Sequence, residues 1–266
     1  MNKILPRILA ATIAAALIAG CAATPQEQDE TRGWSAEKIY AEAKAEQISK
    51  NYDRSNKLLE KLEARYPYGR HAQQAILETA YNNYKGQEPL LALSAIDRFI
   101  KQYPAHPSMD YAFYLRGLVH FNESQGFLSF LSKQDMSERD PQAARDSFES
   151  FSQLVTRFPD SRYAADAQLR MGYLIGALAD YELHVAKYYY KRGAYLAAAN
   201  RGKHLLETYG NTKQVEPALG VMVLAYDKLG LTELRDDAKR VLLKNYPDTK
   251  VLDPESLQGR AWWAPW

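Results

Sequence analysis

Residues 92–104 read ALSAIDRFIKQYP, a helical pattern that ends at an aromatic residue followed by proline. Pro104 has no backbone N–H to donate, and its ring clashes with the preceding helical turn, so a helix must end there. The same kind of ending recurs along the chain. These endings, which we call closing marks, are Tyr66-Pro67, Tyr103-Pro104, Phe158-Pro159, Tyr209-Gly210 and Tyr246-Pro247.

The marks follow one another at spacings of 37, 55, 51 and 37 residues. Two spacings are close to the ~34 residues of a tetratricopeptide repeat, and the other two exceed it by an insertion. Equivalent positions carry equivalent residues. Counted from the proline or Gly210 of each mark, the residue five before is large and apolar (Leu62, Phe99, Leu154, Leu205, Leu242), and the residue eight after is alanine (Ala75, Ala112, Ala167, Ala218). The residue twelve before is small in four marks (Ser55, Ala92, Ser147, Ala198) and is Arg235 in the fifth. The residue thirteen after is small in three marks (Ala80, Gly117, Gly172) and is Val223 in the fourth.

This periodicity predicts an all-α tetratricopeptide-repeat superhelical solenoid of about five repeats. Each helix pair buries its apolar face against the next pair, which produces one continuous core and a curved surface. The repeats are expected at 35–68, 69–105, 106–160, 161–211 and 212–248. The insertion in the third repeat, at 125–141, carries an apolar cluster and is either a loop packed on the solenoid or an exposed contact element. That cluster comprises Phe127, Leu128, Phe130 and Leu131.

The amino terminus has the layout of a secretory signal, with Lys3 and Arg7 before an apolar run at 8–19. That run is shorter than the ~20 residues that a transmembrane helix needs. Cys21, the single cysteine of the chain, follows directly, and residues 18–21 (IAGC) resemble the lipobox of bacterial lipoproteins. The resemblance implies that residues 1–20 are removed and that Cys21 carries S-diacylglycerol and N-palmitoyl groups, with no other cofactor. Ala22 instead of Asp implies sorting to the outer membrane.

Residues 21–34 are polar, lack apolar periodicity and are expected to form a lipidated flexible tether. Loss of the signal would leave 32 basic and 32 acidic residues. A nucleic-acid-binding protein would normally show a basic excess gathered on one face, so this class of function is excluded.

The sequence contains no motif that indicates catalysis. The serine-hydrolase, zinc-protease, P-loop and dinucleotide-binding patterns are all missing. The five histidines include no pair spaced three or four apart, so a metal site on a helix is not expected. The chain is therefore predicted not to be an enzyme.

Tyrosine is abundant, with 19 residues, and several tyrosines are paired at helical spacing. Tyr81 with Tyr84, and Tyr111 with Tyr114, are three apart and so share a helix face. They either fill the solenoid core or line a binding surface, because tyrosine is apolar in its ring and polar at its tip. Two arginines accompanied by aromatic residues, Arg116 and Arg192, are further candidates for stacking or for pairing with a carboxylate.

The chain resembles the BamD (ComL/YfiO) family, the lipoproteins of the outer-membrane β-barrel assembly machinery, from about residue 17 to about residue 248. The ordered set of motifs carries this resemblance: RYPYG at 65–69, AIDRFI at 95–100, HP-x-x-DY at 106–111, RGL at 116–118, RDPQ-x-AR at 139–145 and YY-x-RGA-x-x-A-x-x-NR at 189–201. It implies a scaffold at the periplasmic face of the outer membrane that binds the POTRA domains of BamA, the lipoproteins BamC and BamE, and unfolded β-barrel clients.

The resemblance also implies a division of labour. Repeats 1–2, at 35–105, would form the client-segment end, and repeats 3–5, at 106–248, the assembly-partner end. Arg201 and Arg192 are the candidates for contact with the barrel subunit. The candidates for contact with client segments are Tyr66, Tyr81, Tyr84, Tyr111, Tyr114 and Arg116. Tyr66 also occupies a closing mark, so a purely structural role stays open for it.

The carboxy-terminal tail at 249–266 departs from the family pattern, because Trp262, Trp263 and Trp266 stand in its last five residues. They either cap the last repeat or meet a membrane interface or a partner. An alternative function also stays open at this point, a lipoprotein scaffold for cell-wall synthesis or hydrolysis built from the same anchor and repeats.

Overall fold

The computed structural model describes residues 29–125 and 141–252, and these residues form helices and no strand. Cys21, most of the insertion at 125–141 and the three tryptophans of the tail lie outside this part. The helices are α2 (Ala36–Ile48), α3 (Tyr52–Arg65), α4 (Arg70–Lys85), α5 (Pro89–Gln102), α6 (Met109–Gln125), α8 (Gln142–Arg157), α9 (Ala164–Lys191), α10 (Tyr195–Tyr209), α11 (Val215–Lys228) and α12 (Thr232–Asn245).

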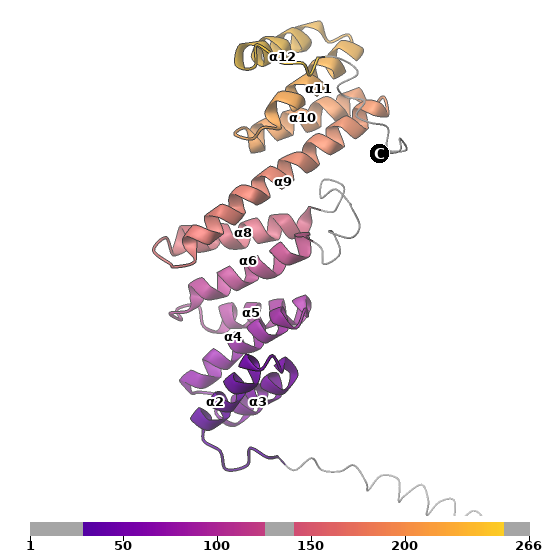
Figure 1. The fold of residues 1–266 in the computed structure, drawn as a ribbon. Coiled ribbons are helices and arrows are strands. Elements are labelled where there is room, and N and C mark those ends of the chain that lie inside the picture. The colour runs from indigo at the N-terminus through magenta and orange to yellow at the C-terminus, as the bar shows by residue number, and fades with distance from the viewer. Residues whose placement is uncertain (1–28, 126–140, 253–266) are drawn as a thin grey trace, which may run out of the picture.

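These helices stack in chain order as five pairs, shown from bottom to top in Figure 1. The first helices are α2, α4, α6, α9 and α11, and each pair lies within one of the five predicted repeat ranges. The predicted all-α tetratricopeptide solenoid is therefore confirmed.

The closing marks end the second helices as expected. Tyr66, Tyr103, Phe158 and Tyr246 are the C-cap residues of α3, α5, α8 and α12, with φ between −127° and −136°, outside the helical region. The large apolar residues five before the marks and the alanines eight after them are completely buried. The repeat alignment thus located the core correctly.

The two glycines that stand thirteen after a mark differ in their surroundings. A Cβ on Gly117 of α6 would lie 2.4 Å from the Phe151 ring of α8, so the small residue is needed for close packing. Gly172, at the equivalent position of α9, is exposed, and a Cβ there would meet nothing within 4 Å. α9 has 28 residues, and Leu174 and Leu178 supply the buried face in that region instead.

The turns that join first and second helices share one backbone conformation at four places. Lys50, Gln87, Gly193 and Gly230 all have φ between 63° and 77°. In each turn the N–H of the next residue bonds to a carbonyl five residues back, as Asn51 does to Glu46 and Leu231 to Tyr226. This arrangement is the Schellman ending, which satisfies the last carbonyls of a helix.

The long helix α9 connects two parts of the core. Leu174 and Leu178 pack in a cluster with α4, α5, α6 and α8, whereas Leu183 and Ala186 pack in a second cluster with α10, α11 and α12. α9 crosses diagonally between these two halves in Figure 1. A third cluster lies around α2 and α3.

The predicted flexible tether ends earlier than residue 34. Asp29 pairs with Lys61 and Arg65 of α3 at 3.1 and 2.6 Å, and the Arg65 guanidinium also donates to the Thr31 carbonyl. The hydrogen bond from the Thr31 hydroxyl, followed by that from Lys61, holds the pKa of Asp29 well below its usual range. Thr31 is completely buried. Residues 29–34 are therefore fixed on α3.

Among the described residues, no helix combines the length and apolar character needed to cross a membrane.

Candidate functional site

A cavity of about 470 Å³ opens among the first helices of the first three pairs and the turn before α9. α2 contributes Lys44 and Gln47, α4 contributes Glu78 and Tyr81, and α6 contributes Tyr111. We call this cavity the tyrosine groove. Its remaining lining residues are Gln74, Leu77, Pro107, Ser108, Asp110, Arg162 and Tyr163.

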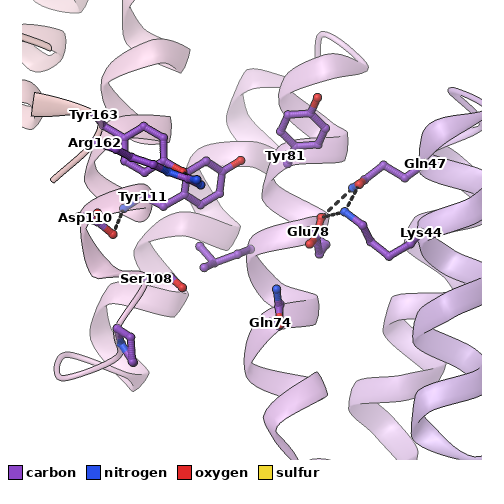
Figure 2. Close-up of a pocket in the computed structure, with 12 residues that line it drawn as sticks. Lys44, Gln47, Gln74, Glu78, Tyr81, Ser108, Asp110, Tyr111, Arg162 and Tyr163 are labelled. Atoms are coloured by element: carbon purple, nitrogen blue, oxygen red, sulfur yellow. Dashed lines mark hydrogen bonds and ion pairs between the residues drawn. The ribbon is translucent and has the colours of Figure 1, made fainter. Parts of the chain in front are cut away.

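Glu78 organises the α2 side of the tyrosine groove. Its carboxylate accepts from Tyr40 at 3.0 Å, from Lys44 at 2.8 Å and from Gln47 at 2.9 Å, all on α2. Figure 2 shows Glu78 with Lys44 and Gln47 on one side and Tyr111, Arg162 and Tyr163 on the other. These contacts join α4 to α2. Because the Glu78 charge is paired with Lys44, Glu78 leaves little net negative charge in the groove.

Aromatic rings form the opposite wall. The Tyr111 and Tyr163 rings lie 5.6 Å apart, and the Arg162 guanidinium lies 4.8 Å from the Tyr163 ring and donates to its hydroxyl at 2.6 Å. Burial raises the pKa of Tyr111 above its ordinary value, so this phenol stays neutral at physiological pH. The wall therefore offers apolar ring surface with hydroxyl and guanidinium donors at its rim.

Only one tyrosine of each predicted pair lines the groove. Tyr81 and Tyr111 do, whereas the Tyr84 hydroxyl accepts from Asn122 of α6 at 3.1 Å. Tyr114 stacks on Tyr163 at 4.6 Å and donates to Asp166 of α9 at 2.7 Å. Tyr84 and Tyr114 thus join neighbouring helices, although their predicted client contacts stay predictions.

The other two client candidates also have internal partners. Tyr66 packs against the third core cluster, around α2 and α3, and donates its hydroxyl to the Trp34 carbonyl at 2.7 Å. Arg116 lies 5.0 Å from the Phe113 ring and donates to Ser150 and Gln153 of α8 at 3.1 and 2.7 Å. The structure brings neither of them into the tyrosine groove.

A second site surrounds Glu182 of α9, whose side chain is 1% exposed. Arg201 of α10 donates to one of its carboxylate oxygens at 3.0 Å. Arg145 of α8 and His204 of α10 lie 3.6 and 3.9 Å from the other oxygen, which accepts no hydrogen bond from a described residue. The Glu182 hydrogen bond raises the pKa of Arg201. One buried carboxylate therefore holds two half-exposed guanidinium groups at the surface.

A cavity of about 410 Å³ adjoins this site and is lined by Tyr189, Ala197, Asn200, Arg201 and His204. Arg192 is exposed at the end of α9 and lies 5.4 Å from the Tyr188 ring, which contacts Tyr189 edge to face. The two predicted partner-binding arginines are thus connected by a pair of tyrosines, although only Arg201 lines the cavity.

Sequence reasoning missed the residues that hold these sites together. Glu78, Glu182 and Arg162 have no distinguishing local motif. The partners of Glu78 come from another repeat, and Glu182 is paired with Arg145 of the preceding repeat as well as with Arg201 of its own. Tyr163 was detectable in principle, because it stands four residues after Pro159 and directly before α9. Within 29–125 and 141–252, no group of three or more His, Cys, Asp and Glu residues could hold a metal ion.

Comparison with known proteins is consistent along nearly the whole chain. Residues 33–242 match the family model "YfiO: Outer membrane lipoprotein". The chain is 52% identical over 237 residues to a protein of Neisseria meningitidis serogroup B, covering 89% of each chain, and 35% identical to a protein of Vibrio cholerae, covering 89% of this chain and 97% of that one. A protein of Xylella fastidiosa is 38% identical, over 87% of this chain and 79% of its own. All three are named "Outer membrane protein assembly factor BamD", and the cell-wall alternative gains no support from them.

Proposed function

Because this chain belongs to the YfiO family of outer membrane lipoproteins, we infer that it is an outer membrane protein assembly factor. It acts as a scaffold in the machinery that assembles β-barrel proteins, and it is not an enzyme. The observation that carries this conclusion is 52% identity to a curated assembly factor over 89% of both chains. The helical repeats agree with such a role, since solenoids present extended binding surfaces.

The protein is associated with the outer membrane, and the proposed attachment is through acylated Cys21. Each buried methylene is worth ~0.8 kcal/mol, so two or more acyl chains hold a protein durably. The anchored chain would lie on the periplasmic face. Cys21→Ser should release it from membranes with unchanged helical content, and the Cys21→Ser protein remaining in the membrane fraction would contradict the anchor.

The tyrosine groove is the proposed binding site for segments of unfolded β-barrel clients. Its polar rim and ring surface suit an extended chain that alternates apolar and polar side chains, because strand residues point alternately to opposite sides. The groove belongs to the first three pairs, so it extends the client-segment end beyond the predicted limit at residue 105.

Photo-crosslinkers at Tyr81 and Gln74, which line the groove, test this assignment. They should capture client segments, whereas a crosslinker at the exposed Lys101 of the outer helix α5 should not. Equal capture at all three positions would show that clients do not use the groove.

The Glu182 site is the proposed contact for the periplasmic POTRA domains of BamA, with BamC and BamE as further partners of the scaffold. Arg201 donates one guanidinium nitrogen to Glu182, which leaves donors for a partner carboxylate or for strand carbonyls. Arg192, beyond the tyrosine pair, would add a second cation to this contact.

Substitution of Arg201 by glutamate would place two carboxylates together and disturb the fold, so milder variants make the sharper experiment. Arg201→Lys keeps the charge but loses the planar fork, and it should weaken copurification of the barrel subunit. Glu182→Gln is the matched control, because it changes the internal pair and leaves the guanidinium in place. Undiminished copurification with Arg201→Lys would reject the assignment.

A further inference from the structure

The turns that join first and second helices lie along one edge of the solenoid. Successive first helices run parallel, since Gln47 near the end of α2 bonds to Asn82 near the end of α4, and Tyr84 of α4 bonds to Asn122 near the end of α6. Tyr114 and Phe121 of α6 contact Asp166 and Tyr173 of α9 in the same order. Gln214 at the start of α11 bonds to Asp180 in the middle of α9, and Asp227 near the end of α11 interacts electrostatically with Tyr190 near the end of α9. Their ends therefore fall on the same side. We call this side the turn edge; its described turns are at 49–51, 86–88, 192–194 and 229–231.

Exposed apolar side chains gather at the turn edge. Of the thirteen large apolar residues exposed in the described part of the chain, eight lie within four residues of one of these turns. The exposed fraction is 80% for Ile48, 77% for Leu90 and 58% for Leu196. The others at this edge are Leu91, Tyr188, Leu229, Leu231 and Leu234. None of the eight lines the tyrosine groove or the cavity beside Arg201.

Each of the four turns has a lysine in it or directly before it: Lys50 lies in the first turn, and Lys85, Lys191 and Lys228 end the helices before the other three. None of them forms an ion pair with a described residue. Among the acidic side chains of the edge, Glu46 and Asp227 pair with Arg54 and Arg235. Glu88 is the N-cap residue of α5, and Asp53 and Glu233 stand in the first turns of α3 and α12. Helix dipoles favour lysine at these positions, but they do not account for the aliphatic side chains exposed beside it.

We propose that the turn edge rests on the phospholipid surface of the membrane that holds the lipid anchor. Aliphatic side chains beside lysines are the composition of interfacial membrane contacts, where apolar groups enter the acyl boundary and ammonium groups meet anionic headgroups. The lysine stems add apolar surface while their charged tips stay at the headgroups. The eight residues are spaced along an edge and do not line a groove. Such an arrangement fits a flat lipid surface better than it fits a bound protein segment.

This proposal rests on the anchor proposed above, which brings the edge to the surface, and one experiment separates the two. Cys21 is the only cysteine of the chain, so in the acylated full-length protein an introduced cysteine is the only free thiol. Leu90→Cys and Leu196→Cys place an environment-sensitive fluorophore on the turn edge. Tyr68→Cys is the matched control, because Tyr68 is 97% exposed in the turn before α4, at the opposite edge.

Each labelled protein is bound to vesicles of phosphatidylethanolamine and phosphatidylglycerol that contain nitroxide-labelled lipid. Quenching should be several-fold stronger at positions 90 and 196 than at position 68. Equal quenching at the three positions would overturn the proposal. Position 90 becoming shielded only when the other assembly subunits are added would also overturn it, because the occupant would then be a protein. Position 196 is left out of this comparison, because the nearby Arg192 belongs to the proposed partner contact.

Flotation of the vesicles reports separately on the anchor. A protein that does not float is tethered through a histidine tag on nickel-chelating lipid, and the quenching ratio is then measured in the same way. Failure of the anchor thus appears as loss of flotation, whereas failure of the turn-edge proposal appears as equal quenching at the three positions.

Discussion

At the scale of single residues, two side chains adopt a backbone conformation that normally favours glycine. Lys50 and Gln87 have φ of 63° and 64°, and the equivalent residues in later repeats are Gly193 and Gly230. For a residue with a Cβ, the left-handed region costs roughly 1–2 kcal/mol. The first two repeats therefore carry local strain that the last two avoid.

We predict that Lys50→Gly and Gln87→Gly each raise the free energy of unfolding by about 0.5–1 kcal/mol. This gain is the relief of left-handed strain minus the cost of the larger conformational entropy that glycine loses on folding. Gly230→Ala is the control, because a Cβ there meets nothing within 4 Å and only its φ of 70° opposes the change. It should be destabilising. Urea unfolding measures all three, and a stabilising Gly230→Ala would contradict the explanation.

A second pair of glycines differs in packing instead of backbone conformation. Gly117→Ala should lower the free energy of unfolding by about 1–3 kcal/mol, since its Cβ would overlap the Phe151 ring. Gly172→Ala, at the equivalent position of the next repeat, should be neutral or stabilising by up to about 1 kcal/mol, because it replaces an exposed helical glycine. Thermal unfolding distinguishes the two variants, and equal losses would mean that the close packing at Gly117 is unimportant.

Sequence alone could locate core residues at repeated positions but not these differences between glycines. Leu62 and its counterparts are buried because every repeat needs a large apolar residue there. Gly117 and Gly172 look equivalent in the alignment, yet only Gly117 meets a neighbouring ring. That distinction depends on the path of α9, which no local pattern encodes.

At the scale of helices, Tyr114 and Asp166 join α6 to α9, and their titration should be visible in stability. Burial, followed by the hydrogen bond to Asp166, raises the pKa of Tyr114 to about 12. Burial opposes ionisation of Asp166, but the Arg170 and Tyr114 hydrogen bonds outweigh it and lower the pKa of that carboxyl. The two shifts have opposite consequences.

Because the folded pKa of Tyr114 lies above the unfolded value of about 10, its contribution to stability is fully present below that pH and disappears as pH rises toward about 12. The lowered pKa of Asp166 gives stability that is present above its unfolded value of about 3.9 and disappears as pH falls through the folded value. Tyr114→Phe should cost about 1.5–3 kcal/mol at neutral pH and remove part of the alkaline decline. Unfolding free energies of both proteins between pH 8 and about pH 12 provide the measurement. An unchanged alkaline decline in Tyr114→Phe would contradict this role.

The number and order of helices followed from the closing marks, whereas the length of α9 did not. The 51-residue spacing between Pro159 and Gly210 indicated extra residues but not where they go. They extend α9 to 28 residues, and its two ends serve different core clusters. The prediction of the candidate sites was incomplete for the same reason. Tyr81, Tyr111 and Arg201 lie at cavities. The pairings of Glu78 with α2 and of Glu182 with Arg201 and Arg145 depend on helices that are distant in sequence.

At the scale of the whole molecule, the tyrosine groove and the Glu182 site lie in different parts of the helix stack, and α9 connects these parts. The groove belongs mainly to α2, α4 and α6, and the Glu182 site to α8, α9 and α10. A scaffold that passes a client segment to a partner needs a fixed distance between the two sites. α9 is the element that sets this distance, because it packs in both core clusters.

We therefore predict that a break in α9 between Leu178 and Leu183 uncouples the two sites and leaves the tyrosine groove intact. Tyr181→Pro removes one helical hydrogen bond and opposes the preceding turn, at a cost of about 3 kcal/mol or more. Tyr181→Ala is the matched control, because it keeps the helix. Distances between fluorophores on α5 and α12 should broaden in Tyr181→Pro and stay narrow in Tyr181→Ala, while groove crosslinking at Tyr81 persists in both. If Tyr181→Pro gave a narrow distribution and still delivered clients to the barrel subunit, α9 would not be the element that fixes the distance between the sites.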